Sequence, residues 1–191
     1  MTPPELVEGG LEEPEELEPE QGTLALADPE HRQYGAPSFV VVPGDEAAAA
    51  ERFSRSVTAW AERQPGMLVV ADAADRDRLL GEVSWRWTTG EALGIADLGY
   101  VVHPDSRRRG VGRRAIALLT RWLLDPDGRG LARVQLDHST ENPASCRVAI
   151  AAGFEREGIR RGFLPLRSPD GTVRRHDVCL HGVTSAPSLP G

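Results

Sequence analysis

The hydrophobic pattern divides most of the chain into helices and strands. Apolar residues at helical spacing predict a helix from about residue 46 to residue 63, and Asp45 is suited to cap it. That apolar stripe consists of Ala50, Phe53, Val57, Trp60 and Ala61. Short apolar or alternating runs predict strands at 67–71, 79–87, 98–102, 134–138, 159–166 and 173–180, with weaker signals at 23–26 and 38–42.

Two further helices follow from glycine and capping signals. The first begins near Val111, and its apolar stripe contains Val111, Ala115, Leu118, Leu119, Trp122 and Leu123. The second follows the capping sequence at 140–142, has Pro143 in its first turn and ends before Gly153. Helices therefore alternate with strands, and a hairpin with a turn at 168–171 closes the chain. The pattern predicts one α/β domain with a mixed sheet.

The charge of the chain is distributed unevenly. Residues 1–20 hold eight of the 29 acidic residues and no arginine, which leaves 21 acids against 22 arginines elsewhere. We expect a disordered acidic tail at 1–21, a folded domain at 22–183 and a flexible tail at 184–191. Because the domain is close to neutral, it lacks the broad basic excess of a nucleic-acid-binding protein.

Cysteine usage and hydropathy indicate the compartment. Cys146 and Cys179 are the two cysteines, and their spacing is not typical of a metal site. There is no signal-peptide pattern and no apolar run of ~18 residues. We therefore expect a reduced cytoplasmic protein with no metal and no membrane contact, and a homodimer remains open.

The chemistry concentrates in a glycine-containing basic loop between a predicted strand and a predicted helix. The loop reads Arg107-Arg108-Arg109-Gly110-Val111-Gly112. Backbone N–H groups at a helix start are unpaired and carry partial positive charge. Glycines allow a phosphate to approach the main chain, and arginines add charge-assisted hydrogen bonds. The loop is neither a P-loop nor a dinucleotide fingerprint, and a basic turn that merely caps a surface helix is the alternative.

Three motifs together resemble the GNAT superfamily of N-acetyltransferases, and within it the RimJ/RimL-like branch of ribosomal-protein alanine acetyltransferases. They are GYVVHP at 99–104, RRRGVG at 107–112 and NPASCRVAIAAGF at 142–154. The segment RHDVCLH at 175–181 is also similar to that branch. The resemblance covers residues 79–182 and implies a mostly antiparallel mixed sheet with splayed central strands, flanked by helices.

The resemblance also implies acetyl-CoA as donor and a primary amine as acceptor. Carried over by position, the backbone of Tyr100, Val101 and Val102 would bind the pantetheine arm. The loop amides, from Arg107 through Gly112 and on to Arg113, would bind the pyrophosphate. Asn142 would bind the arm from the other side. Ser145 would lie near the sulfur as a general acid.

The remaining catalytic group is a base for the amine, and the candidates are Asp97 first and Glu82 second. A strand N–H near Val101 would stabilise the oxyanion. Each side chain also has a structural interpretation: Asn142 as an N-cap, Ser145 as a first-turn residue, and the two acids as half-exposed strand residues. His138, His176 and His181 are treated as structural or substrate-side residues. An acyl intermediate on Cys146 is not expected, since no base is visible beside it.

The front of the chain departs from the branch, whose members usually open with a strand and two helices on the acceptor side. Here residues 1–43 contain an acidic tail and short ambiguous pieces, so the N-terminal part of the domain is atypical or shortened. Two functions remain: an N-acetyltransferase acting on a protein N-terminus or a small-molecule amine, and a regulatory acetyl-CoA-binding module that is weak or inactive. A basic-loop nucleic-acid binder is the weakest alternative.

Overall fold

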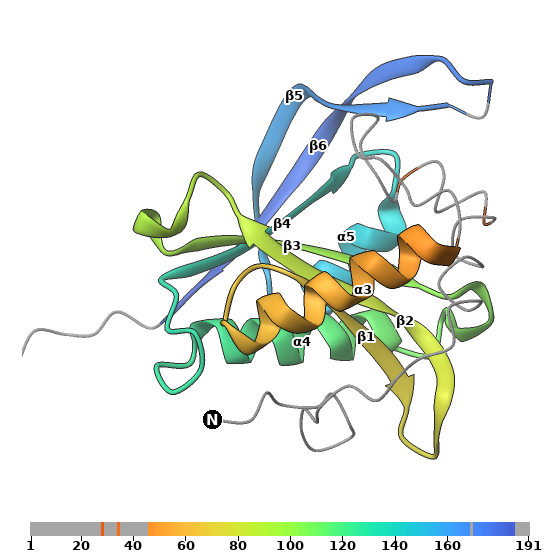
Figure 1. Cartoon of the computed structure of the whole chain (residues 1–191). Coiled ribbons are helices and arrows are strands. Elements are labelled where there is room, and N and C mark those ends of the chain that lie inside the picture. The colour runs from red at the N-terminus through yellow and green to blue at the C-terminus, as the bar shows by residue number, and fades with distance from the viewer. Residues whose placement is uncertain (1–27, 29–33, 35–45, 169, 186–191) are drawn as a thin grey trace, which may run out of the picture.

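The described part of the chain forms one mixed sheet with helices packed against it (Figure 1). The computed structural model describes residues 28, 34, 46–168 and 170–185. The strands are β1 (Met67–Asp72), β2 (Asp75–Trp87), β3 (Ile95–Val102), β4 (Arg133–Ser139), β5 (Glu155–Arg167) and β6 (Val173–Thr184). The helices are α3 (Glu46–Ala61), α4 (Val111–Leu124) and α5 (Pro143–Ala151), with 3-10 turns η1 (Glu91–Leu93) and η2 (Pro104–Ser106).

The sheet order is β1-β2-β3-β4-β6-β5. Only the central β3–β4 pair is parallel, and the other neighbours are antiparallel. This confirms the predicted fold class, a single α/β domain with a mixed and mostly antiparallel sheet. The acidic tail at 1–21, the weak strands at 23–26 and 38–42, the cap at Asp45 and most of the tail at 184–191 lie outside the described residues.

All six strands are longer than their hydrophobic patterns predicted, and β2, β3, β5 and β6 are longer by three residues or more. β2 begins at Asp75 rather than at 79, because β1 and β2 continue pairing until Asp72 faces Asp75. The added residues 75–78 are exposed, so hydrophobicity carries no signal for them. β5 begins at Glu155, and β6 continues to Thr184 because it pairs with β4 as far as Arg133. Figure 1 shows part of the β5–β6 hairpin extending away from the rest of the sheet.

Helix α4 buries the face that its sequence predicted, with one shift. Val111, Ala115, Leu119 and Leu123 are buried as expected, whereas Leu118 is only half-buried. Ile116 is fully buried in its place. These side chains join one core with apolar residues of β1 to β4, so the helix is anchored along its length. The start of α4 is therefore held in a fixed position against β3.

Helix α3 lies beside α4, which it contacts through two tryptophan rings. The ring centroids of Trp60 and Trp122 are 4.4 Å apart. Ser56 and Trp60 are buried, whereas Val57 and Ala61 are exposed, so the predicted stripe was wrong at those two positions. The reason is that α3 buries only the side facing α4 and the start of β1. The side chains of Ala50 and Phe53 lie outside the described part. No helix among the described residues has the length and hydropathy that crossing a membrane requires.

Candidate active site

The two central strands separate at one end, which forms a fork in the middle of the sheet. β3 and β4 pair from Ile95 and Arg133 to Leu98 and Leu136, and no further. Beyond that point β3 pairs with β2 alone, through residues 99–102, and β4 pairs with β6 alone, through residues 137–139. The backbone edges that face each other across the fork are therefore free of strand pairing between β3 and β4. This geometry is the splayed arrangement that the sequence predicted around Tyr100, Val101 and Val102.

A hydroxyl pair connects the β3 side of the fork to helix α5. Tyr100 Oη and Ser145 Oγ are 2.9 Å apart, and either can be the donor. Ser145 is buried in the first turn of α5, and Tyr100 is half-buried. The sequence predicted Ser145 near the reacting sulfur but assigned no partner to the Tyr100 hydroxyl. The pairing joins residues 45 positions apart, so it depends on tertiary structure.

Asn142 is the N-cap of α5, as its structural interpretation predicted. Its Oδ1 accepts a hydrogen bond of 3.1 Å from the backbone N–H of Ser145. The cap uses the oxygen of the side-chain amide, so the Nδ2 group is the donor that a bound ligand could meet. Capping by Asn142 also fixes the position of Ser145 at the start of the helix.

The basic loop leads directly into the N-terminus of α4. Gly110 is the N-cap with φ 77°, a left-handed conformation that favours glycine. The first intrahelical bond runs from Arg114 N–H to the Gly110 carbonyl, so the amides of Val111, Gly112 and Arg113 precede the hydrogen-bonded ladder. Their donors and the partial positive charge of the helix start suit a diphosphate.

Gly112 has a packing role between α4 and β3. A Cβ placed on Gly112 would lie 3.1 Å from the Tyr100 ring and 3.2 Å from a Val102 methyl group. The missing side chain therefore allows α4 to approach β3 closely, a packing role that the sequence analysis did not assign. That the backbone of both glycines lets a phosphate approach stays a prediction.

The loop arginines fall into two groups. Arg107 is half-buried, donates to the Val102 carbonyl at 3.3 Å and pairs with Asp28. Arg108, Arg109 and Arg113 are exposed around the helix start. Arg107 is thus engaged in holding the loop to the end of β3, while the other three guanidinium groups extend from the loop and the first turn. The donor set fits a multiply charged phosphate group.

The two candidate bases lie on strands next to the fork. Asp97 and Glu82 both belong to the face of the sheet opposite Leu98 and Tyr100, by the alternation along β2 and β3. Asp97 accepts a hydrogen bond of 2.6 Å from Gln135 and lies 3.4 Å from the Arg86 guanidinium. Its assignment as base stays a prediction, and so does that of Glu82.

Asp137 is a third carboxyl group that the sequence analysis did not select. It is the first residue of β4 beyond the fork, on the same face as Asp97. Burial raises the pKa of Asp137, and the negative charge of Asp97 raises it further, against the lowering effect of Arg86 and Arg160. A raised pKa makes a carboxylate a stronger proton acceptor. Strand alternation puts Asp137 on one face of its strand, but the β3–β4 register and the end of that pairing were needed to place it near Asp97 at the fork.

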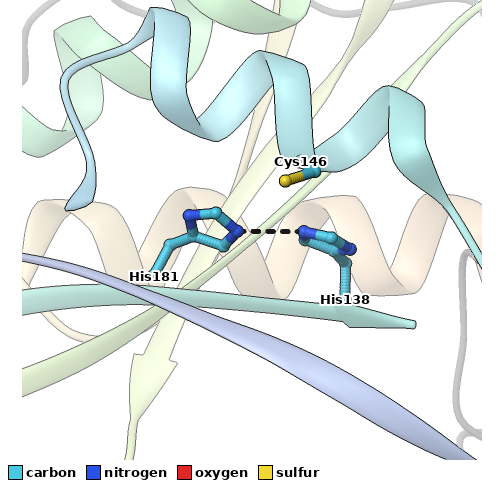
Figure 2. Close-up of side chains that lie close together, drawn as sticks. All are labelled: His138, Cys146 and His181. Atoms are coloured by element: carbon cyan, nitrogen blue, oxygen red, sulfur yellow. Dashed lines mark hydrogen bonds between the residues drawn. The ribbon is translucent and has the colours of Figure 1, made fainter. Parts of the chain in front are cut away.

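The histidines that the sequence treated as structural form two separate contacts. His176 Nδ1 lies 2.9 Å from Ser139 Oγ. His138 Nε2 lies 3.2 Å from His181 Nε2, and Cys146 of α5 lies beside this pair (Figure 2). Linear spacing gave no sign of the second group, because its three members come from β4, α5 and β6.

The comparisons with known proteins address the family. A model of the acetyltransferase (GNAT) domain matches residues 13–155. The chain belongs to the GNAT acetyltransferase family. The match begins inside the segment expected to be a tail at 1–21, and the domain boundaries stay a prediction. A search of curated protein sequences finds no match. Acetyl-CoA-dependent acetylation is the activity typical of GNAT proteins, and the acceptor of this chain is not fixed by membership.

Solved structures share the GNAT fold at low sequence identity. The ribosomal-protein-S5-alanine acetyltransferase from Vibrio fischeri is 19% identical, with a TM-score of 0.73 and 88% of each chain covered. RimJ from Mycobacterium smegmatis, solved with CoA-disulfide, is 20% identical, with a TM-score of 0.73 over 95% of this chain and 84% of that one. The spermidine N-acetyltransferase from Vibrio cholerae, solved with CoA and spermine, is 17% identical, with a TM-score of 0.61 over 78% of this chain and 80% of that one.

Proposed function

We propose that this GNAT protein transfers the acetyl group of acetyl-CoA to a primary amine by direct attack of the amine on the thioester. The observation that carries the proposal is the combination of the β3–β4 fork with the N-terminus of α4. At the fork β3 and β4 no longer pair with each other, which leaves a place between the two strands for an extended arm. The helix start supplies amides and arginines for a diphosphate. β3 connects the two features, because it forms one side of the fork and leads through the basic loop into α4.

The chain's own groups have distinct tasks in such a transfer. A backbone N–H near Val101 would stabilise the oxyanion that forms when the amine attacks. The hydroxyl pair of Tyr100 and Ser145 would donate a proton to the departing thiolate, with one hydroxyl donating to the other as the proton leaves. The second hydroxyl would then regain a proton from solvent before the next turnover, and the relay would make Tyr100 a side-chain participant as well as a backbone ligand.

The acceptor amine must lose protons, and acidic groups on one face of the sheet are placed to receive them. Asp97, Glu82 and Asp137 share that face next to the fork. Negative charge there also favours an ammonium ion as it approaches. Asp97 remains our first candidate because it lies on the central strand, and Asp137 joins it because its raised pKa suits proton exchange.

Two acceptor classes fit this arrangement, a protein N-terminal amine and a small-molecule amine. The relatives with the same fold are named for one or the other, ribosomal-protein alanine or spermidine. A thiol-release assay with acetyl-CoA would separate them, using peptides with an N-terminal alanine, the same peptides with a blocked N-terminus, and polyamines. We expect release with one class and none with blocked peptides.

The same assay tests the alternative of a binding module without turnover. That alternative would be supported by calorimetric binding of CoA with no thiol release over the whole panel. Absence of CoA binding would overturn both forms of the proposal.

A further inference from the structure

Two buried histidines and a cysteine meet beneath helix α5. His138 is on β4, His181 on the neighbouring β6, and Cys146 in the first turn of α5. One ligand atom from each lies within 4.8 Å of the other two (Figure 2). His138 is 6% exposed, His181 is fully buried and Cys146 is half-buried. The transferase activity proposed above uses none of these three side chains.

The hydrogen bonds fix which ring atoms carry lone pairs. His138 Nδ1 lies 2.9 Å from the Ser139 carbonyl, which can only accept, so the proton is on Nδ1 and the lone pair is on Nε2. That lone pair points at His181 Nε2 (Figure 2). His181 Nδ1 is buried with no hydrogen-bond partner in the described part of the chain. In the neutral pair the proton of His181 is therefore on Nε2, and this N–H···N bond is the one hydrogen bond of the ring among the described residues.

The distances are those of ligands around a metal ion. Two nitrogens bound to Zn²⁺ at about 2.0–2.1 Å in tetrahedral geometry lie about 3.3 Å apart. The observed separation of the two Nε2 atoms is 3.2 Å. A histidine that binds metal through Nε2 commonly donates its other N–H to a backbone carbonyl, as His138 does to Ser139. Binding through both Nε2 atoms requires the His181 proton to move from Nε2 to Nδ1, and it requires Cys146 Sγ to come closer by a side-chain rotation or a small shift of α5.

The charge state of the pair is also suited to coordination. Burial lowers the pKa of His138 and of His181, which favours the neutral form of each ring. Neutral imidazole is the form that binds metals. Asp137 and Glu157 supply negative charge towards the two rings, and Arg156 opposes them. Nitrogen and thiolate ligands together select borderline and soft cations such as Zn²⁺ over Mg²⁺ or Ca²⁺.

From this geometry we infer that His138, His181 and Cys146 form a binding site for one Zn²⁺ ion, with a fourth position left to water. Coordination replaces the hydrogen bond between the rings with two nitrogen–metal bonds, moves the His181 proton from Nε2 to Nδ1, and releases the Cys146 thiol proton to solvent. It also ties the first turn of α5 to β4 and β6. Because Ser145 precedes Cys146 in that turn, the metal fixes the helix start that carries the proposed proton donor.

Cobalt spectroscopy on the full chain tests the site directly. The protein is purified without a histidine tag, reduced, stripped with a chelator and titrated with Co²⁺ in the absence of oxygen. We expect a thiolate-to-cobalt charge-transfer band and the strong visible bands of a four-coordinate ion, saturating at one equivalent. Zn²⁺ should remove both sets of bands and should raise the thermal midpoint, since it binds the folded state.

Matched variants separate this site from other cysteines and histidines. Cys146→Ser should abolish the charge-transfer band and weaken Zn²⁺ binding by about a hundredfold or more, since changes even to outer partners of a site weaken binding 10–100-fold. Cys179→Ser and His176→Asn alter residues outside the cluster and should keep the band and the thermal shift. The inference is wrong if one equivalent of Co²⁺ gives no thiolate band, or if Cys146→Ser retains the zinc-induced shift.

Discussion

At the scale of single residues, the hydroxyl pair at the fork gives the sharpest test of the proposed reaction. We expect Ser145→Ala and Tyr100→Phe each to lower kcat by about tenfold or more, because general acid catalysis contributes ~10²–10⁴-fold and the two hydroxyls share it. The Kd for CoA should change little. Steady-state kinetics and calorimetry measure the two quantities.

Ser54→Ala is the matched control for this pair, because Ser54 is exposed on α3. Its kcat should equal that of the unmodified protein. A full rate in both Ser145→Ala and Tyr100→Phe would remove the hydroxyl pair from the mechanism.

The buried imidazoles predict how stability depends on pH. Burial lowers the pKa of His138 and His181 below the ordinary value of ~6.5, so the unfolded chain binds protons at a higher pH than the folded one. Their stabilising contribution is full above about pH 6.5 and is lost as the pH falls through the folded-state pKa values. The free energy of unfolding should therefore decrease on acidification.

Urea unfolding between about pH 7.5 and pH 5, with a chelator present, measures this dependence. His138→Asn should have a smaller slope than the unmodified protein, even where its stability is lower throughout. Equal slopes in the two proteins would show that the pair does not titrate as expected.

At the level of single residues, the sequence predicted those features that depend on neighbouring residues in the chain. The cap at Asn142 and the start of α5 at Pro143 follow from neighbouring residues and were predicted correctly. The bond between Tyr100 and Ser145 was not predicted, because it joins a strand to a helix across the fork. The cluster of His138, His181 and Cys146 was missed for the same reason.

At the scale of elements, Gly112 is the position at which α4 packs closely against β3. Gly112→Ala would place a methyl group 3.1 Å from the Tyr100 ring, on side chains that are already packed. We expect a loss of about 1–2 kcal/mol in the free energy of unfolding, since overpacking outweighs the helix propensity gained. Denaturant unfolding measures it. Gly158→Ala is the control, because no atom lies within 4 Å of its added Cβ, and it should be nearly neutral.

The N-terminus of α4 is tested by a charge at its cap. Gly110→Glu should abolish measurable CoA binding, because a carboxylate would stand where a diphosphate is expected. Gly110→Ala carries the same strain at φ 77° without the charge, so it should weaken binding much less. Equal CoA affinity in the glutamate variant and the unmodified protein, measured by calorimetry, would contradict the assignment of this loop.

Helices and strands were predictable to different extents. The positions of α4 and β3 follow from strong periodicity and from glycines at the junction. The start of β2 at Asp75 does not, because exposed residues extend that strand by backbone pairing alone. The inward side of α3 was misassigned at Val57 because the described part of α3 buries a narrow stripe, which contains Ser56 and Trp60.

At the scale of the whole molecule, the net charge is −7, but the basic loop before α4 is locally positive. The exposed arginines 108, 109 and 113 surround one helix start. We therefore expect CoA binding to weaken several-fold between low salt and about 0.5 M NaCl, because exposed charges are screened over a Debye length of ~10 Å at 0.1 M. Calorimetry at the two salt concentrations measures the change.

Arg108→Ala should reduce this salt dependence, whereas Arg55→Ala on the exposed surface of α3 should leave it unchanged. CoA affinity that does not respond to salt would argue against phosphate contacts by these arginines.

The fork also divides the sheet into two halves. Four residue pairs are the whole parallel seam between the β1-β2-β3 half and the β4-β6-β5 half. An extended ligand between β3 and β4 would form hydrogen bonds to both halves of the sheet, at the positions where β3 and β4 no longer pair with each other. The contacts that hold the thioester would then also slow the opening of this seam. Amide hydrogen exchange at residues 99–102 and 137–139 should therefore become slower when the ligand binds.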